Sequence, residues 1–158
     1  MALIKLNSNS YSSVENLLGS NGLIQTKYYL ITSTQISTTS TSFVDLGSAF
    51  NFTPLSTNSI LIVNISTDMK HDDGYGQNIR LLKDGTAVTP IGSSNSWLFY
   101  RDDNGTANNH AAASFFIKLA NSSTSQIAFK LQQKLFNSGE VGVGNWGNTE
   151  VVIQEIAQ

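Results

Sequence analysis

Hydrophobic and polar residues alternate along most of the chain after residue 22, and a period of two predicts β-strands. The clearest example is Ser125–Phe136, where every second residue from Ile127 to Leu135 belongs to one largely apolar face. The residues between them are mostly polar, as expected for a strand with one buried and one solvated face. This segment is therefore predicted to be a half-buried strand.

Similar segments, bounded by Gly, Pro, Asn, Asp and Ser, predict further strands. They are Gln25–Thr32, Phe43–Leu46, Ala49–Thr53, Asn78–Lys83, Thr86–Ile91, Trp97–Arg101, Ala112–Leu119 and Thr149–Ala157. The Asp84-Gly85 dipeptide predicts a tight hairpin turn between two of them. About eight strands with turns roughly every 8–12 residues are typical of a β-sandwich or barrel.

Ser59–Thr67 differs from the other strands because Ile60–Val63 is apolar on both faces. Such a run predicts a central strand covered on both sides. In a sandwich whose surface is otherwise polar, the second apolar face needs a partner to cover it.

Two stretches are less regular. Ser33–Ser42 carries no charge and predicts a loop or a polar edge. The glycine-rich stretch at 139–147 has no helix signal after it, so it does not match a phosphate-binding loop. It predicts a flexible or bulged hairpin segment.

The first 22 residues predict an N-terminal arm that contains one short helix. A serine and a glutamate with capping-box spacing mark the start of a helix over Ser13–Leu18. Val14, Leu17 and Leu18 would share one face of it. So short a helix is not stable alone. These three residues are therefore predicted to anchor the arm on a partner.

Composition supports the same fold class. Charged residues make up 13% of the chain, about half the roughly 25% of an ordinary domain. Ser, Thr, Asn and Gln together number 59 of 158 residues. Except for Gln, these residues favour turns, caps and the solvent face of strands over helix surfaces. The prediction is an all-β protein: a single antiparallel, jelly-roll-like β-sandwich over residues 23–158, after an arm over residues 1–22.

Charge and cysteine content exclude several classes of function. A net charge of −2 provides no basic field for nucleic acid. The absence of cysteine excludes disulfides and Cys-based zinc sites. The apolar runs are far shorter than a membrane span, and the first residues lack the apolar core of a signal peptide. Neither nucleic-acid binding nor membrane insertion is expected.

Two acidic clusters are candidates for a cation site or for catalysis. The first contains Asp68, His71, Asp72 and Asp73, and the second contains Asp102 and Asp103 with His110 beyond them. A hard cation such as calcium would use these carboxylates, but solvated turns explain the same residues, and the spacing matches no known metal motif. Acid–base catalysis would need the two loops to meet across a cleft. No metal, cofactor or enzymatic activity is predicted.

Four aromatic residues lie in or beside polar loops: Tyr75, Trp97, Tyr100 and Trp146. Exposed rings flanked by amides and carboxylates can hold sugars, although such rings also serve as core or interface anchors. With His71, Asp72, Asp73 and Asp102 they define candidate outward-facing, receptor-binding loops. A free-standing carbohydrate-binding module is therefore an alternative function.

A series of strand and turn motifs goes beyond these general signals. It consists of Thr-Ser-Thr-Ser-Phe-Val-Asp-Leu-Gly (39–47), Phe-Thr-Pro (52–54), Ser-Ile-Leu-Ile-Val (59–63), Ile-Arg-Leu-Leu-Lys-Asp-Gly-Thr (79–86) and Val-Ile-Gln-Glu-Ile-Ala (152–157). Their order resembles the small jelly-roll virion proteins of marine tailed bacteriophages, labelled as tail-fibre or structural proteins. The opening Met-Ala-Leu-Ile-Lys-Leu-Asn (1–7) resembles their arm. The likeness covers residues 38–158 and the start, and departs over 92–112.

The resemblance implies a homotrimer located on the virion, assembled in the host cytoplasm, with no enzymatic activity. Its arm would bind capsid or tail proteins, and its loops would face outward, with a host-surface glycan as a further candidate partner. An arm of about twenty residues extends to at most some 70 Å. So short a reach favours a capsid decoration protein or head fibre over the tip of a long tail fibre.

Overall fold

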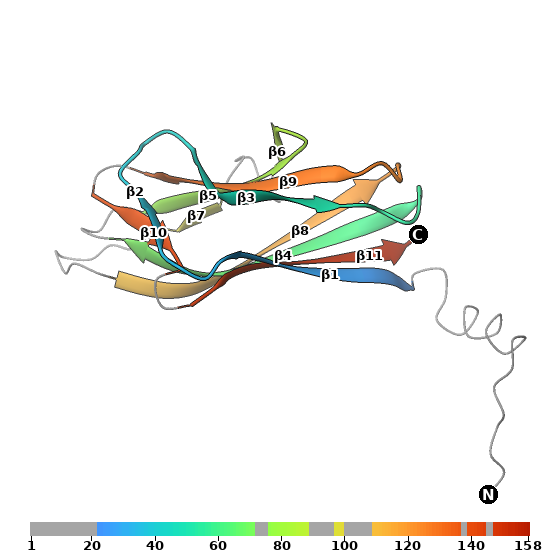
Figure 1. Cartoon of the computed structure of the whole chain (residues 1–158), viewed down its shortest axis with the longest axis horizontal. Helices are drawn as coiled ribbons and strands as arrows, with labels where there is room; N and C mark the ends of the chain where they lie inside the picture. Colours follow the sequence, from blue (N-terminus) through green and yellow to red (C-terminus); the bar gives the residue numbers. More distant parts are fainter. Residues whose placement is uncertain (1–21, 72–75, 89–96, 100–108, 137–138, 145–146) are drawn as a thin grey trace, which may run out of the picture.

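The computed structural model describes residues 22–71, 76–88, 97–99, 109–136, 139–144 and 147–158. These residues form two antiparallel β-sheets, called sheet A and sheet B, packed face to face (Figure 1). Sheet A contains β1 (Leu23–Thr32), β2 (Ile36–Thr38), β4 (Ser59–His71), β8 (Asn109–Asn121), β10 (Val141–Val143) and β11 (Thr149–Ala157). Sheet B contains β3 (Val44–Phe52), β5 (Gln77–Lys83), β6 (Thr86–Ala87), β7 (Trp97–Phe99) and β9 (Ile127–Leu135).

The strand order is that of a jelly roll. In sheet A the long strands run β1-β11-β4-β8, and in sheet B the order is β3-β9-β5-β7. The short strand β10 lies between β4 and β2, and β6 forms a hairpin with β5. The chain passes from one sheet to the other before β3, β4, β5, β8, β9 and β10, as in eight-stranded double-sheet folds. The predicted all-β sandwich is confirmed.

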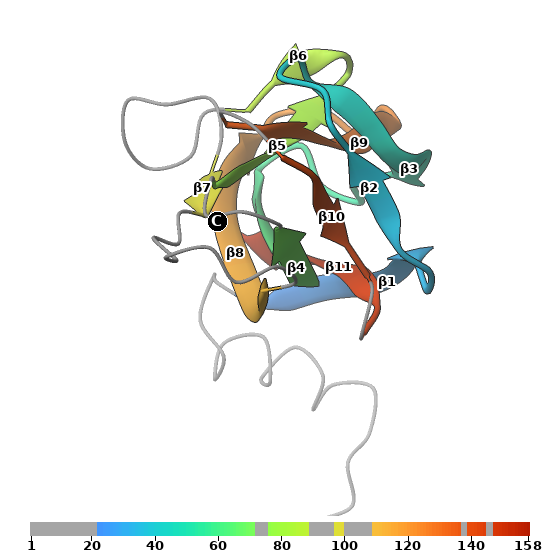
Figure 2. The ribbon, with the colours of Figure 1, turned by 90° about the vertical axis from the view of Figure 1, so that its left-hand side faces the viewer.

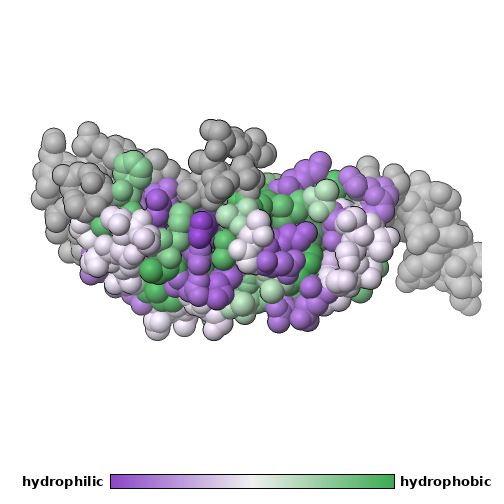
Figure 3. All heavy atoms as spheres, turned by 90° about the horizontal axis from the view of Figure 1, so that it is seen from above, coloured by the Kyte–Doolittle hydropathy of each residue, from purple (hydrophilic) through white to green (hydrophobic). Residues whose placement is uncertain are grey.

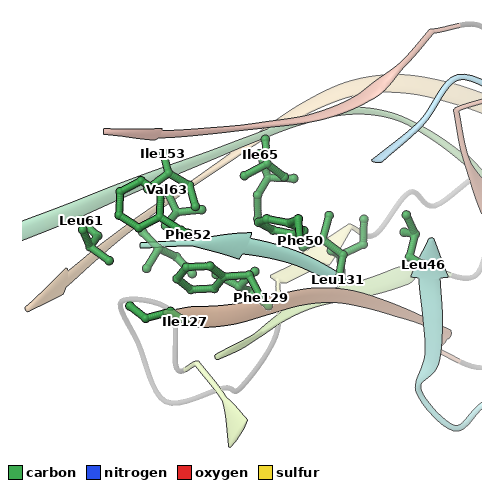
Figure 4. Packing of buried hydrophobic residues seen from close by; sticks show 14 of the residues in the cluster. Leu46, Phe50, Phe52, Leu61, Val63, Ile65, Ile127, Phe129, Leu131 and Ile153 are labelled. Atoms are coloured by element: carbon green, nitrogen blue, oxygen red, sulfur yellow. The ribbon is translucent and has the colours of Figure 1, made fainter. Parts of the chain in front are cut away.

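The core lies between the two sheets and follows the predicted alternation. From β9, Ile127, Phe129 and Leu131 are buried, while the residues between them are not. Opposite them, Leu61 and Val63 of β4 point inward from sheet A (Figure 4). Viewed from the end, the two sheets face each other, and β2 and β10 lie together along one side (Figure 2). The half-buried strand predicted over Ser125–Phe136 is confirmed.

The two short strands predicted around Gly47 are one strand in the structure. β3 continues through Gly47, and its pairing with β9 shifts register between Leu46 and Phe50. Gly47 has a positive φ of 72°, so it forms an irregularity within the strand and does not end it. The turn predicted at Asp84-Gly85 is confirmed, because both residues have positive φ and they connect β5 to β6.

Substituting Gly47 with alanine is expected to destabilise the fold by roughly 2–4 kcal/mol. The left-handed conformation itself costs about 1–2 kcal/mol, and a Cβ there would lie 2.9 Å from Ile31 Cγ2 and 3.0 Å from Ile31 O. Gly85→Ala is the matched control, because its φ is 78° but nothing lies within 4 Å of its Cβ position. Urea denaturation should show the smaller loss for Gly85→Ala; equal losses would contradict the role of the Ile31 contact.

The segment predicted as a flexible hairpin around 139–147 contains a buried strand. Val141 and Val143 of β10 are fully buried, and β10 pairs with both β4 and β2. A Cβ at Gly142 would lie 3.2 Å from Ile36 O, so glycine permits this close approach. Gly144 has a φ of 73°, and its N–H donates to Asp68 O at 3.0 Å. The hairpin prediction is wrong for Val141–Val143, because these residues pair between two other strands.

The buried carboxylate of Glu155 joins the end of β11 to the β3–β4 connection. It accepts hydrogen bonds from Gln25 Nε2 at 2.6 Å, Ser59 Oγ at 2.8 Å, Leu55 N at 2.9 Å and Ser56 N at 3.0 Å. Burial alone would raise its pKa, but these hydrogen bonds together hold the pKa below its usual value. Glu155 is therefore an ionised buried group that fixes the local backbone.

The other predictions have mixed outcomes. Ser33–Ser42 contains the short strand β2 at one edge of sheet A, in agreement with a polar edge. Of the strand predicted over Thr86–Ile91, the structure shows Thr86–Ala87. The predicted helix at Ser13–Leu18 lies outside the described residues. No helix in the described part of the chain is long and apolar enough to cross a membrane.

Candidate interaction face

The outer face of sheet B carries a row of paired polar side chains. Because Asp45, Gln132 and Arg80 are aligned in register across β3, β9 and β5, their side chains meet. Lys130 Nζ donates to Asp45 Oδ2 at 2.7 Å, and Gln132 Nε2 donates to Asp45 Oδ1 at 2.8 Å. Arg80 Nε donates to Gln132 Oε1 at 2.8 Å. The bonds from Lys130 and Gln132 lower the pKa of Asp45.

Two cations of this face also contact an aromatic ring. The Arg80 guanidinium lies 3.8 Å from the centre of the Phe43 ring, and Lys134 Nζ lies 5.1 Å from it. Hydrophilic residues are spread across this side of the molecule, among paler and hydrophobic ones (Figure 3). With its charges paired and hydrogen-bonded, the outer face of sheet B is suited to contact with water.

The outer face of sheet A is different, because large apolar side chains occupy it. The register places Tyr28, Val152, Asn64 and Phe116 in one row across β1, β11, β4 and β8. Because every second residue of a strand points to the same face, neighbouring rows add further apolar residues to this surface. We call this surface the apolar face; its apolar members are Leu23, Tyr28, Leu30, Ile60, Ile62, Phe116, Val152 and Ile156.

Several members of the apolar face are exposed to a degree that is unusual for such large side chains. Tyr28 is 56% exposed, Leu30 51% and Phe116 59%. None of the described strands lies over this face (Figure 1). The sequence predicts that Ser59–Thr67 is covered on both sides. Within the described chain only its inner side is covered, so the outer side is available to another protein surface.

Two charges of the apolar face lie on opposite halves. Glu150, on β11, accepts a hydrogen bond from Asn148 Nδ2 at 3.0 Å and a second from the Tyr28 hydroxyl. These bonds lower the pKa of Glu150, and the bond to Glu150 raises the pKa of Tyr28. Lys118, on β8, is exposed and sits opposite Ile62. Glu150 thus lies on the β1–β11 half, and Lys118 lies on the β4–β8 half.

A shallow groove of about 560 Å³ lies at one end of the apolar face. Small residues form much of its lining, among them Ser66, Ala112 and Ser114, with Asp68, Asn148 and Glu150. Nearby, His110 Nδ1 lies 3.4 Å from Asp68 Oδ2. The groove is therefore a depression with small side chains beside the exposed apolar residues.

The structure brings Asp68 of the first predicted acidic cluster next to His110, which lies beyond the second cluster in the sequence. Asp68 and His110 meet because β4 and β8 pair along their whole length. The described residues contain no group of three or more His, Asp or Glu side chains that could hold a metal. The predicted site residues Asp72, Asp73, Tyr75, Tyr100, Asp102 and Trp146, and the arm residues Val14, Leu17 and Leu18, lie outside the described residues.

Two of the predicted loop residues lie on strands. His71 is the last residue of β4, where its backbone is paired with Asn109 and Val141, and Trp97 begins β7 opposite Ile79. For His71 the loop prediction is wrong, because the strand continues past the apolar run at Ile60–Val63 through pairing with β8 and β10.

Tyr28, Leu30 and Phe116 were not predicted as surface residues. A signal was present at Phe115-Phe116, where two adjacent large apolar residues must point to opposite faces of a strand. The alternation of strand faces predicts that Ile60–Val63 is apolar on both faces. For Phe115-Phe116 the same alternation predicts one exposed ring.

Comparisons with known proteins do not assign this chain to a family. No protein-family model matches the chain, and no curated protein is similar to it in sequence. A chain in the structure of infectious bursal disease virus Gx strain is similar in structure, with a TM-score of 0.37 and 16% identity. The match covers 85% of this chain and 37% of that chain, so this protein spans well under half of its length.

Proposed function

We propose that the protein is a non-enzymatic structural protein of a bacteriophage virion. It is a homotrimeric jelly roll displayed on the particle as a capsid decoration or head fibre, or as a tail-fibre component. The observation that carries this proposal is the apolar face, on a sandwich whose core is already complete. Large exposed apolar patches mark sites of protein association, so the subunit is built to be covered by another protein.

The trimer and the virion setting follow from the resemblance of the strand and turn motifs. The low charge content of the chain supports the same setting, because an assembly of many copies repeats every surface charge many times. A nearly neutral surface rich in hydroxyl and amide groups limits that repulsion. The paired charges on the outer face of sheet B agree with a face directed to solvent.

The start of β1 and the strand ends that flank the proposed receptor loops lie at opposite ends of the sandwich. Gly22 O accepts a hydrogen bond from Ala157 N, so the arm joins the sandwich where β11 ends. The segments 72–75, 100–108 and 145–146 follow β4, precede β8 and precede β11, and the antiparallel register brings these three strand ends together at the opposite end. The strand ends that flank the proposed receptor loops thus lie far from the start of β1, which supports a role for one end of the sandwich in anchoring and for the other in contact with host-surface glycans.

Deleting residues 1–21 is expected to leave a folded sandwich that no longer joins particles. The core cluster of the described residues joins strands of both sheets, and the truncated protein keeps all of these contacts. Circular dichroism should show an unchanged β-sheet spectrum, and purified particles should lack the truncated protein. Full incorporation of a folded truncated protein would contradict the anchoring role of Val14, Leu17 and Leu18.

A further inference from the structure

We infer that the outer face of sheet B binds an acidic polysaccharide. Its carboxylate or sulfate groups contact Arg80 and Lys134, and its uncharged rings lie along β9. The contacts of this face carry the anion site itself. The choice of a polysaccharide as the source of the anion rests on the proposed function, in which the particle meets the glycans of a host surface.

Two cations of this face have no acidic partner. Asp45 Oδ2 lies 2.7 Å from Lys130 Nζ, so this carboxylate is already paired. Within the described part of the chain, Arg80 and Lys134 form no ion pair, and both lie against the ring of Phe43. The ring attracts the two cations but does not neutralise them. Like charges that share one ring repel each other, and a bound anion relieves this repulsion.

The guanidinium group of Arg80 is held in one orientation. Its Nε donates to Gln132 Oε1 at 2.8 Å, and its central carbon lies 3.8 Å from the centre of the Phe43 ring. Gln132 is fixed in turn, because its Nε2 donates to Asp45 Oδ1 at 2.8 Å. The two terminal nitrogens of Arg80 have no acceptor among the described residues. They form a planar fork that suits the two oxygens of a carboxylate or sulfate, and an ordered side chain loses little entropy on binding.

A groove of about 280 Å³ lies beside Arg80 on the same face, and Gln132, the hydrogen-bond partner of Arg80, is part of its lining. The lining combines charged and amide side chains with small or apolar ones, among them Asp45, Lys130, Ala49, Leu82 and Ala128. Charged and amide groups bond sugar hydroxyls, and small apolar side chains leave room for a sugar ring. The groove therefore suits the uncharged part of a chain whose acidic group is bound by Arg80.

The groove and the two cations follow one line along β9. Ala128, Lys130, Gln132 and Lys134 are successive outward-facing residues of this strand and span about 20 Å. A line of this length offers repeated weak contacts to several linked sugars, and such contacts add up in avidity. Lys134 lies beside the start of β5, and the segment 72–75 ends just before that strand. The site thus adjoins the end of the sandwich where the proposed receptor loops lie.

Titration calorimetry of the full-length protein with four polymers tests the inference. Oligosaccharides of polygalacturonate carry carboxylates, dextran sulfate carries sulfates, and dextran is the uncharged control. Poly-glutamate distinguishes an acidic polysaccharide from an acidic polypeptide. At about 0.15 M salt, where distant charges are screened, wild type should bind at least one acidic polysaccharide more tightly than poly-glutamate and should not bind dextran.

Arg80→Lys is the most informative variant, because it keeps the charge and loses the planar fork. It should weaken binding at least about fivefold. Lys134→Gln removes the second cation and should also weaken binding. Lys83→Gln is the matched control: it removes one positive charge from the strand that carries Arg80, but three residues along, where the side chain alternates to the other face. Circular dichroism should show the same fold for all three variants.

Each result has a defined meaning. Binding that Arg80→Lys weakens and Lys83→Gln leaves unchanged would support the inference. No binding to either acidic polysaccharide would overturn it, and so would unchanged binding by Arg80→Lys, because attraction by net charge alone needs no fork. Poly-glutamate bound as tightly as the polysaccharides would overturn the choice of a glycan. These failures leave the proposed function intact, since that proposal is tested by the mass of the protein in solution and by its incorporation into particles.

Discussion

Replacing Glu155 with leucine is expected to lower the free energy of unfolding by about 3–5 kcal/mol. The side chain is fully buried and accepts four hydrogen bonds, two of them from the backbone N–H groups of Leu55 and Ser56. Leucine removes the acceptor of all four bonds, which are buried or partly buried, and each donor left unsatisfied costs about 1–3 kcal/mol. Urea denaturation followed by tryptophan fluorescence measures the loss at a fixed protein concentration.

Glu140→Gln is the matched control for this experiment. Glu140 is part-exposed and lies 3.7 Å from Lys70 Nζ, so its replacement should change the free energy of unfolding by less than about 1 kcal/mol. Similar losses for Glu155→Leu and Glu140→Gln would contradict a structural role for the buried carboxylate.

The same carboxylate predicts a pH dependence of stability. The pKa of Glu155 is lower in the folded protein than its ordinary value, so the folded state favours the ionised form. Its contribution is complete above the unfolded pKa of about 4.3 and is lost as the pH falls through the folded pKa. Wild type should therefore lose more stability than Glu155→Gln between neutral and acidic pH. Parallel losses in both proteins would show that another group is responsible.

The second large effect is expected at the apolar face. Phe116→Asp should weaken self-association at least a hundredfold, because it places a charge on the apolar face that the proposed trimer would cover. The fold should persist, since Phe116 points away from the core on a strand whose inward residue Ile117 is buried. Sedimentation velocity over a range of protein concentrations measures the change.

Phe136→Asp provides the comparison for Phe116→Asp. Phe136 is 53% exposed, nearly as much as Phe116, but it follows β9 of sheet B and does not belong to the apolar face. This variant should associate like wild type. Equal effects of both substitutions would show that exposed aromatic residues in general, and not this face, govern association.

Strands were predicted best from the sequence where one face of the strand is buried and the other is exposed to solvent. In β9 one strand face is buried and the other solvated, so the period of two is visible in Ser125–Phe136 itself. In β3 the prediction divided the strand at Gly47, because a glycine signals a break as well as an irregularity that the strand accommodates. The distinction depends on the partner strand β9, more than 70 residues away in the chain.

The candidate site was predicted only in part for the same reason. Apolar residues on both faces of Ile60–Val63 indicated that a second surface needs a cover, and the structure locates that surface on the outside of sheet A. Which residues share it depends on register among β1, β11, β4 and β8, and register between distant strands is not readable from one sequence. The meeting of Asp68 with His110 has the same origin.

The mass of the full-length wild-type protein in solution tests the central claim most directly. A homotrimer of the 17.1 kDa chain has a mass of about 51 kDa. Light scattering coupled to size-exclusion chromatography at micromolar concentration is predicted to give this value. A mass of 17.1 kDa that persists at high concentration would contradict the account, because the apolar face would then be stable without a second copy to cover it.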